Sequence, residues 1–327
     1  MSRILITDKT DPVLQQTLES AGHQVVVDTT VTYDSLLKQI GQFDALVVRS
    51  KINIDRRFLD HARHLRCIGR VGAGMETIDA DYAESLGIRC LNSPEGNRDA
   101  VGEHALGLLL SLFNHIASAD AEVRQGLWQR EANRGIELKG RTVGIIGFGN
   151  MGSAFAQRLQ GFECNIIAYD KYKLAGYAPA YVQEVTLEEL QERADVLSLH
   201  VPLTPETHHM VDHNFIQRFR HNFHLINTSR GTVVNTPDLA RALEERHILG
   251  AALDVIEYED MSRDGLDLEH LPPDFQYLIH SPRTVLTPHV AGWTVESRYK
   301  LAAVLAQKMI QILSQQPHYS HPFTTIC

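Results

Sequence analysis

The sequence predicts an α/β protein of two lobes, each built around a doubly wound parallel sheet. The chain has 327 residues, which is enough for two domains with separate hydrophobic cores. Short apolar runs alternate with segments of helical periodicity along both halves of the chain, and this is the order of repeated βαβ units. A glycine-rich turn near the middle joins one apolar run to a helix and marks the core of the second lobe.

Composition and charge limit the class of protein. Hydrophobic residues make up 43% of the chain and charged residues 22%, as in an ordinary globular protein. The formal net charge of −9 argues against nucleic acid or an anionic membrane as a partner. The apolar run after Met1 is too short for a signal peptide, and no run approaches the ~18 apolar residues of a membrane span. Four scattered cysteines without a Cys-x-x-Cys pair favour a reduced, cytoplasmic chain with no metal site or disulfide.

The first lobe is predicted from five apolar runs, each suited to a strand that is buried on both faces of a parallel sheet. These runs are residues 3–7, 24–27, 45–48, 66–70 and 89–91. Helical periodicity is found between them at residues 12–21, 33–40, 56–61 and 80–86. Asp11 followed by Pro12 is a typical helix start, and Gly22 and Gly41 stand where helices commonly end.

The second lobe begins after residues 92–97 interrupt this pattern. Residues 100–116 are very apolar and predict one long buried helix that crosses between the lobes, and residues 119–140, which include Trp128, predict an arm. Six strands are then predicted at residues 142–146, 165–169, 196–200, 224–227, 250–253 and 284–286. Helices between them are predicted at residues 153–160, 187–193, 214–219 and 237–245.

The last part of the chain contains one irregular segment and one helix. Residues 258–282 are acidic, contain proline and lack a clear period, which predicts a long functional or mobile loop. Residues 294–313 have amphipathic helical spacing and are expected to return to the first lobe. The first lobe would then be discontinuous, with a cleft between the lobes and no regulatory domain after the last helix.

The turn Gly147-Phe148-Gly149-Asn150-Met151-Gly152 carries the strongest local signal, because it follows a predicted strand and precedes a predicted helix. Its first glycine permits a tight turn, its second lets backbone N–H groups approach a pyrophosphate, and its third lets helix and strand pack closely. Asp170 ends the next strand 18 residues after Gly152, near the ~20-residue spacing of an acid that binds a ribose. The order of strand, helix, strand and acid predicts a dinucleotide site, with a flavodoxin-like turn or a methyltransferase loop as the alternative.

Three polar residues follow strands of the second lobe, at the edge where ligands bind to parallel sheets. Arg230 has a forked guanidinium that can bind a carboxylate and polarise the neighbouring carbonyl. His289 can exchange the hydroxyl proton during hydride transfer, and a carboxylate such as Glu259 beside it favours the protonated ring. Taken singly, each has an ordinary explanation: a surface ion pair, one histidine among 17, or part of a solvated acidic loop. Together with a dinucleotide fold, the set predicts chemistry on a 2-hydroxy acid/2-oxo acid couple.

Seven motifs are spread along the chain. They are Arg70-Val71-Gly72-Ala73-Gly74, Asn92-Ser93-Pro94, Gly147-x-Gly149-x-x-Gly152, His200-Val201-Pro202-Leu203-Thr204, Asn227-Thr228-Ser229-Arg230-Gly231, Ala252-Leu253-Asp254-Val255 and Thr287-Pro288-His289. With these motifs in this order, the sequence resembles the D-isomer-specific 2-hydroxyacid dehydrogenase family over nearly its whole length.

The resemblance implies a catalytic set and a cofactor. The catalytic set is Arg230, Glu259 and His289, and the cofactor is NAD. The implied NAD contacts are Gly147, Phe148, Gly149, Asn150, Met151, Gly152, Asp170, His200, Val201, Pro202, Thr207, Thr228, Ser229, Asp254 and Gly292. Asp170 should favour NAD over NADP by repelling a 2′-phosphate, although the neighbouring Lys171 and Lys173 could soften that repulsion.

The resemblance also implies which lobe binds the substrate and which binds the cofactor. Residues 1–98 and 291–327 would form a discontinuous, flavodoxin-like substrate-binding domain, and residues 99–290 a Rossmann NAD-binding domain. The implied contacts to a small 2-hydroxy or 2-oxo acid substrate are Arg49, Ser50, Gly72, Ala73, Gly74, Asn97 and Arg230. The arm at residues 119–140 implies a homodimer, because such an arm packs on the partner's dinucleotide domain in this family.

Two positions depart from the family's pattern near the proposed acid. An aromatic residue is usual at position 256 and a proline after the catalytic glutamate, whereas this chain has Ile256 and Asp260. The spacing from Asp254 still favours Glu259 as the partner of the histidine, with Glu257 as the fallback. Formate dehydrogenases of the same fold pair the histidine with glutamine instead, which counts against that variant.

The resemblance leaves the substrate open. Arg49-Ser50, Arg70, Asn97 and Arg130 resemble phosphate- and substrate-binding positions of members that act on 3-phosphoglycerate, but generic carboxylate binding would explain them equally well. Reduction of glyoxylate or hydroxypyruvate is the alternative within the family. An NAD-sensing corepressor that binds partner peptides is the alternative outside catalysis, and the intact set of Arg230, Glu259 and His289 favours an enzyme.

Overall fold

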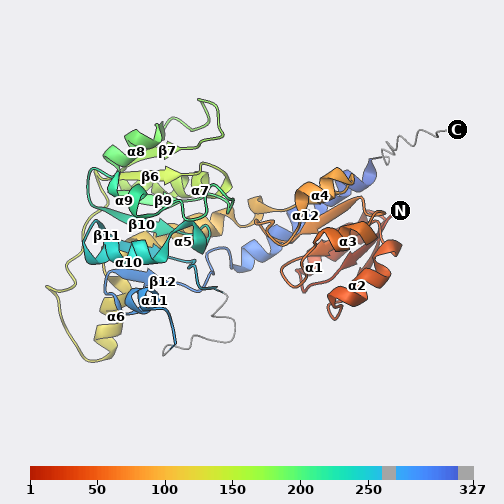
Figure 1. The fold of residues 1–327 in the computed structure, drawn as a ribbon, viewed down its shortest axis with the longest axis horizontal. Coiled ribbons are helices and arrows are strands. Elements are labelled where there is room, and N and C mark those ends of the chain that lie inside the picture. The colour runs from red at the N-terminus through yellow and green to blue at the C-terminus, as the bar shows by residue number, and fades with distance from the viewer. Residues whose placement is uncertain (260–269, 316–327) are drawn as a thin grey trace. The chain divides into compact units, whose positions relative to one another are not determined.

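The computed structural model describes residues 1–259 and 270–315 (Figure 1). The chain divides into two compact units, one formed by Met1–Asn97 with Thr294–Cys327 and the other by Arg98–Trp293. The corresponding boundaries were predicted after residues 98 and 290. Each unit contains one parallel sheet, so the prediction of two parallel-sheet lobes is confirmed.

The sheet of the first unit has five parallel strands in the order β2-β1-β3-β4-β5, which is the flavodoxin-like order. All five were predicted, with ends within one residue. They are β1 (Arg3–Ile6), β2 (Gln24–Val27), β3 (Ala45–Val48), β4 (Cys67–Arg70) and β5 (Arg89–Leu91).

Among the residues that the structure describes, five α-helices cover this sheet. They are α1 (Pro12–Ser20), α2 (Tyr33–Gln39), α3 (Arg56–His61), α4 (Ala80–Ser85) and α12 (Val295–Ser314). Asp11 caps α1 by accepting a hydrogen bond from the Val13 N–H at 3.1 Å, and Gly22 follows α1 with φ = 85°. The expected role of Gly41 was wrong. It lies inside the short 3₁₀ helix η1 (Ile40–Gln42) without a positive φ, so η1 and not a left-handed glycine ends α2.

Helix α12 belongs to the first unit, although the strands of that unit all lie near the start of the chain. Its buried residues Leu305 and Met309 pack with Ile4 and Ile6 on one face of the sheet, while α2, α3 and α4 cover the other face. The short 3₁₀ helix η2 (Pro94–Gly96) packs against α12 so closely that a Cβ on Gly96 would lie 2.5 Å from a backbone nitrogen of α12. Apolar burial from two distant segments therefore completes this core.

The sheet of the second unit has seven parallel strands in the order β12-β11-β10-β9-β6-β7-β8. Six strands were predicted, and β8 was not among them because a strand of two residues at the sheet edge is too short to show a pattern. The strands are β6 (Thr142–Ile146), β7 (Asn165–Tyr169), β8 (Gln183–Glu184), β9 (Val196–Leu199), β10 (Phe223–Asn227), β11 (Ile248–Leu253) and β12 (Thr284–Leu286).

Seven α-helices are described in the second unit, and they correct the predictions at two places. The expected helix over residues 100–116 is two helices, because α5 ends at Phe113 and His115 takes a left-handed conformation with φ = 53°. Helix α11 lies within the expected loop, whose residues 260–269 are outside the described residues. The helices are α5 (Arg98–Phe113), α6 (Ile116–Arg124), α7 (Asn150–Leu159), α8 (Leu187–Arg193), α9 (His213–Gln217), α10 (Thr236–Glu244) and α11 (Pro273–His280), with 3₁₀ turns η3 (Gln160–Phe162) and η4 (Gly231–Val233).

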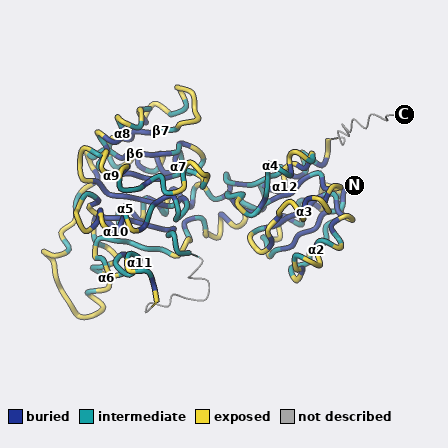
Figure 2. The backbone as a smooth tube through the Cα atoms, viewed as in Figure 1, coloured by how far each residue is buried: buried dark blue, intermediate teal, exposed yellow. Residues whose placement is uncertain are grey.

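Two buried clusters lie on opposite faces of this sheet. Helices α5 and α7 contribute to one, and α8, α9, α10 and α11 to the other. Successive side chains of β6 point to opposite faces of the sheet, so Ile145 belongs to the first cluster and Ile146 to the second. Figure 2 shows the central strands β9 and β10 buried, whereas residues 124–132 are exposed. None of the helices in the described part of the chain is long and apolar enough to cross a membrane.

Candidate active site

The predicted cofactor and catalytic residues of the second unit share one edge of its sheet. All seven strands run in parallel, so the loops that follow them emerge on the same side. The glycine turn follows β6, Asp170 follows β7, and the 200–207 turn follows β9. Arg230 lies just after β10, while Glu259 and His289 lie beyond β11 and β12. The strand order therefore gathers residues that are up to 142 positions apart in the sequence.

The glycine turn has the geometry that an anion site needs. Gly147 has φ = 88°, and a Cβ on it would lie 2.5 Å from the carbonyl oxygen of His200. A Cβ on Gly152 would lie 2.1 Å from the carbonyl oxygen of Gly147, so both positions require glycine. Helix α7 begins at Asn150, three residues earlier than predicted, and within the described residues no side chain caps it. Its first N–H groups can therefore bind a pyrophosphate.

Asp170 is held directly beside this turn. Its Oδ2 atom accepts a hydrogen bond from the Phe148 N–H at 2.9 Å, and its Oδ1 atom accepts one from the Tyr172 N–H at 3.1 Å. Lys171 pairs with Glu206 on the turn after β9, and this ion pair lowers the pKa of the Glu206 carboxyl. The carboxylate of Asp170 is thus fixed at the position where a ribose acid is expected.

The turn after β9 is ordered by its own hydrogen bonds. The imidazole of His200 contacts the Ser198 hydroxyl at 2.8 Å, and burial lowers its pKa to about 3, so the ring is neutral at ordinary pH. The Thr207 hydroxyl donates to the Pro202 carbonyl at 2.6 Å. Of these predicted cofactor residues, Thr207 therefore holds the backbone of the turn, whereas the His200 ring contacts the Ser198 side chain on β9.

The loop after β10 fixes Arg230 through Asn227. The side-chain oxygen of Asn227 accepts bonds from the N–H and the hydroxyl of Ser229, at 3.0 and 2.7 Å, while its amide donates to the Arg230 carbonyl at 2.9 Å. Gly231 packs against the loop after β11, where a Cβ would lie 1.9 Å from the Ile256 carbonyl oxygen. The buried hydroxyl of Thr228 has no hydrogen-bond partner among the residues described, which suits a ligand contact.

His289 and Glu259 form a hydrogen-bonded pair at the same edge. The Nδ1 atom of His289 lies 2.8 Å from a Glu259 oxygen, with the two side chains 49% and 37% exposed. An ionised carboxylate only accepts hydrogen bonds, so Nδ1 carries a proton and Nε2 is left for a substrate. The hydrogen bond to Glu259 raises the pKa of His289, and the charges of Glu259 and Asp254 add to this effect. Burial and the positive charge of Arg230 oppose it.

Asp254 supports this pair through hydrogen bonds to the residues on either side of His289. It is 1% exposed and accepts hydrogen bonds from the Thr287 hydroxyl at 2.6 Å and from the N–H groups of Val290 and Ala291 at 2.9 and 2.8 Å. Burial acts to raise the pKa of the Asp254 carboxyl, but these donors and His104 outweigh it and the pKa is lowered. The predicted cofactor contact is thus an ionised group with several partners in its own chain.

The fallback acid, Glu257, has a different partner. Its carboxylate contacts His209 Nε2 at 2.7 Å and accepts a hydrogen bond from the Thr236 N–H at the start of α10 at 3.0 Å. Burial acts to raise the pKa of Glu257, but these contacts lower it overall. The structure therefore separates two His–Glu pairs, and only the pair of Glu259 includes His289. The second pair was missed because no sequence pattern links His209 to Glu257.

The predicted substrate residues of the first unit lie after β3, β4 and β5. The Arg70 side chain donates to the Arg49 carbonyl at 3.3 Å and lies against Gly72, which has φ = 153°. The Asn92 amide donates to the Ala73 carbonyl at 2.6 Å. Arg70 thereby links the backbone of Arg49, which Ser50 follows in the chain, to the 72–74 loop. Farther along, the buried side-chain oxygen of Asn97 has no hydrogen-bond partner in the described part of the chain.

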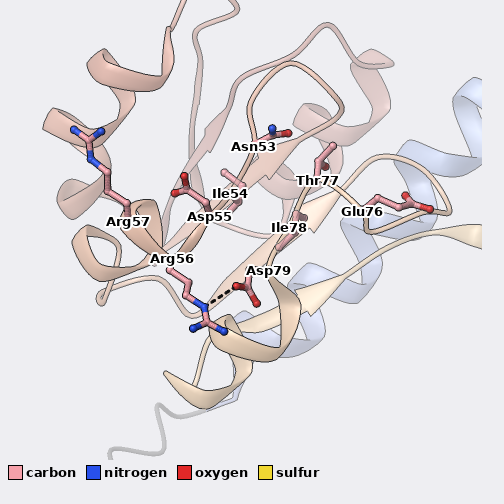
Figure 3. A pocket seen from close by; sticks show the side chains of 9 residues that line it. All are labelled: Asn53, Ile54, Asp55, Arg56, Arg57, Glu76, Thr77, Ile78 and Asp79. Atoms are coloured by element: carbon pink, nitrogen blue, oxygen red, sulfur yellow. Dashed lines mark hydrogen bonds and ion pairs between the residues drawn. The ribbon is translucent and has the colours of Figure 1, made fainter. Parts of the chain in front are cut away.

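A pocket of about 490 Å³ in the first unit is lined by residues 53–57 and 76–79, which Figure 3 shows as sticks. None of the predicted substrate residues lines it. Three of its charged groups have partners in this unit, since Arg56 pairs with Asp79 at 3.1 Å and Asp55 accepts a hydrogen bond from Tyr33 at 2.6 Å. The pocket is therefore separate from the predicted substrate residues.

The parallel sheet, the uncapped helix after the glycine turn and the acid after β7 define the second unit as a dinucleotide-binding domain. Residues 106–291 match the family model described as "D-isomer specific 2-hydroxyacid dehydrogenase, NAD binding domain". The chain belongs to the D-isomer specific 2-hydroxyacid dehydrogenase family. This finding confirms the family resemblance and the expectation of an NAD-binding domain.

Individual relatives agree with this membership. The chain is 35% identical over 315 residues to a D-3-phosphoglycerate dehydrogenase from Methanocaldococcus jannaschii, covering 96% of this chain and 58% of that protein. It is 32% identical over 315 residues to a hydroxypyruvate reductase from Thermotoga maritima, covering 95% and 98%. The crystal structure of the TT0316 protein from Thermus thermophilus is similar with a TM-score of 0.78, at 30% identity over 95% and 96%. The chain thus spans little more than half the length of the first of these relatives.

Proposed function

We propose that this chain catalyses the NAD-dependent interconversion of a D-2-hydroxy acid and its 2-oxo acid. The observation that carries the proposal is the hydrogen bond between His289 and Glu259, which lies within the electrostatic influence of Arg230 at the edge that carries the glycine turn. A proton donor, a carboxylate-binding cation and a dinucleotide site are the three parts that this reaction needs.

The cofactor would be held by the loops after β6, β7 and β10. The first N–H groups of α7 bind the pyrophosphate, Asp170 accepts hydrogen bonds from a ribose, and the Thr228 hydroxyl supplies a further polar contact. NAD, when bound, supplies or accepts the hydride at the C2 carbon of the substrate.

His289 moves the proton that accompanies the hydride. In reduction, the protonated ring donates from Nε2 to the carbonyl oxygen, and in oxidation the neutral ring accepts the hydroxyl proton at the same atom. Glu259 acts through His289, because it holds Nδ1 and favours the imidazolium. Arg230 binds the substrate carboxylate with its forked guanidinium and polarises the adjacent carbonyl.

For the substrate we propose the pair 3-phosphoglycerate and 3-phosphohydroxypyruvate. The guanidinium of Arg70 lies against Gly72 of the 72–74 loop, which we propose cradles the carboxylate, and it donates to the backbone carbonyl of Arg49. With Arg49 it supplies two cationic residues for a phosphate. The relative from Methanocaldococcus jannaschii carries the corresponding name. Hydroxypyruvate or glyoxylate reduction is the second candidate. It is favoured by the match to a hydroxypyruvate reductase over 98% of that protein's length.

We also propose that the chain acts as a homodimer in the cytoplasm. Four large apolar side chains of α6 and the segment after it are at least 42% exposed, namely Ile116, Val123, Leu127 and Trp128. A second copy of this chain would cover them and gain the free energy of apolar burial.

A panel of 2-oxo acids tests the proposed function. The purified chain is mixed with NADH and 3-phosphohydroxypyruvate, hydroxypyruvate or glyoxylate, and the loss of reduced-nicotinamide absorbance is followed. We expect the highest kcat/KM with 3-phosphohydroxypyruvate, and Arg70→Ala should lower it more for this substrate than for hydroxypyruvate. A higher kcat/KM with the unphosphorylated acids would favour the second candidate. Binding of NADH without turnover on a wider panel would favour a sensor.

A further inference from the structure

The backbone around His289 is unusual and needs support. His289 has φ = 53°, a left-handed conformation that is uncommon for residues other than glycine. Such conformations persist where the surrounding structure fixes them. The His289 N–H donates to the Asp254 carbonyl at 2.8 Å, and the carboxylate of Asp254 accepts the next two backbone N–H groups, of Val290 and Ala291. The position of the His289 ring therefore depends on Asp254.

A third residue completes this support from helix α5. The Nε2 atom of His104 lies 3.0 Å from the Thr287 hydroxyl oxygen, which itself lies 2.6 Å from Asp254 Oδ1. His104 Nε2 is also 3.4 Å from the same carboxylate oxygen. The side chain of His104 is 25% exposed, whereas that of Asp254 is 1% exposed. The three side chains form a chain of contacts that runs from α5 to the loop of His289.

The direction of the hydrogens in this chain follows from the chemistry of the groups. The carboxylate has no proton to give, so the single hydroxyl proton of Thr287 points to Asp254. The Thr287 oxygen can then only accept a hydrogen bond from His104. His104 therefore carries a proton on Nε2, and the order of donation is His104 to Thr287 to Asp254.

We propose that His104 is a positioning residue for His289. This proposal rests on the proposed function, in which His289 is the proton donor. By donating to Thr287, His104 keeps the threonine hydroxyl directed at Asp254, and Asp254 keeps the backbone of His289 in its left-handed conformation. Loss of the donor would release the Thr287 hydroxyl and loosen the loop, so that Nε2 of His289 would be held less accurately against the substrate.

Two shape-preserving substitutions and one rescue variant test this. His104→Phe keeps a ring without the donor, Thr287→Val keeps the branched shape without the hydroxyl, and His104→Gln restores an N–H donor near the position of Nε2. We expect kcat for reduction to fall by about 10- to 100-fold in His104→Phe and in Thr287→Val, because small misplacements of catalytic groups have costs of this size. His104→Gln should recover most of the loss, and the NADH dissociation constant should change little.

The double variant His104→Phe with Thr287→Val separates a shared role from independent ones. If both residues act through Asp254, the double variant should be no slower than the worse single variant. His221→Phe, an exposed histidine before β10, is the matched control and should keep wild-type kcat. Additive losses in the double variant, or a His104→Gln variant as slow as His104→Phe, would overturn the proposal.

A measurement without substrate keeps this test separate from the proposed function. Amide hydrogen exchange at Val290 and Ala291 reports directly on the hydrogen bonds to Asp254 in the protein alone. We expect faster exchange at both amides in His104→Phe and Thr287→Val, and near wild-type exchange in His104→Gln. Unchanged exchange in both of the first two variants would refute the positioning role even if the chain turned over no oxo acid. Faster exchange without turnover would instead refute the proposed activity and leave the positioning of the loop established.

Discussion

Replacing Glu259 by glutamine gives the most direct test of the proton donor. The substitution keeps the size of the side chain and removes the negative charge 2.8 Å from His289 Nδ1. The pKa of His289 is raised chiefly by this hydrogen bond, so it should fall in the variant. Reduction needs the imidazolium, which is populated below the pKa and lost as pH rises through it. The midpoint of the pH profile for reduction should therefore move to lower pH.

The size of this change follows from the exposure of the pair. A hydrogen bond to a charged group contributes about 1.5–3 kcal/mol when it is shielded from water. The two side chains are 49% and 37% exposed, so solvent screening reduces the contribution to about 1 kcal/mol. One pH unit corresponds to about 1.4 kcal/mol, so we expect the midpoint to move down by about 0.5–1 pH unit. Well below the midpoint, kcat should remain close to that of the wild type.

The assay is kcat for reduction measured across the pH range with saturating oxo acid. Glu257→Gln is the matched control, because Glu257 contacts His209 and not His289, and its midpoint should not move. His289→Ala should lower kcat by about 10²–10⁴-fold at every pH. An inactive Glu259→Gln together with a nearly normal His289→Ala would refute the assignment. Another group, such as Glu257 or His280 on α11, would then have to be the proton donor.

Three further outcomes are expected. Arg230→Lys should recover little of the activity lost in Arg230→Ala, as measured by kcat/KM, because one ammonium cannot form the two-pronged contact; full recovery would argue against carboxylate binding. NAD should be preferred over NADP, and Glu206→Gln should raise kcat/KM with NADP by about 2- to 5-fold, because it frees Lys171 from an exposed ion pair. A wild-type preference for NADP would refute the role of Asp170. Light scattering at micromolar concentration should give a dimer mass for the wild type and a monomer mass for Trp128→Glu, and a monomeric wild type would exclude the proposed dimer.

The sequence alone was sufficient for most of the fold. Apolar runs bounded by turn residues identified eleven strands, including all five of the first unit. The break between α5 and α6 was not predicted, because the apolar pattern continues to Ile116 while the left-handed residue at position 115 is a histidine and not a glycine. Helix α11 was not predicted either. It is short, begins with proline and lies in a segment rich in acids.

The candidate site was predictable at the level of residue types and strand ends. The spacing from Gly152 to Asp170 places an acid after β7, and the structure holds it against the Phe148 N–H. What could not be predicted is which groups bond to one another. The contacts of Asp254 with Thr287 and His104 join residues that are 33 or more positions away from it in sequence, and they depend on how α5 packs on the sheet.

The two His–Glu pairs show how tertiary packing resolves an ambiguity that spacing leaves open. Glu257 and Glu259 are two residues apart, and either could face His289 when only the sequence is considered. The carboxylate of Glu257 binds at the N-terminus of α10, where the Thr236 N–H and the helix dipole favour a negative charge. Gly231 permits this close approach, since any larger residue there would collide with the Ile256 carbonyl. With Glu257 fixed at the helix and bonded to His209, Glu259 remains as the acid that reaches His289.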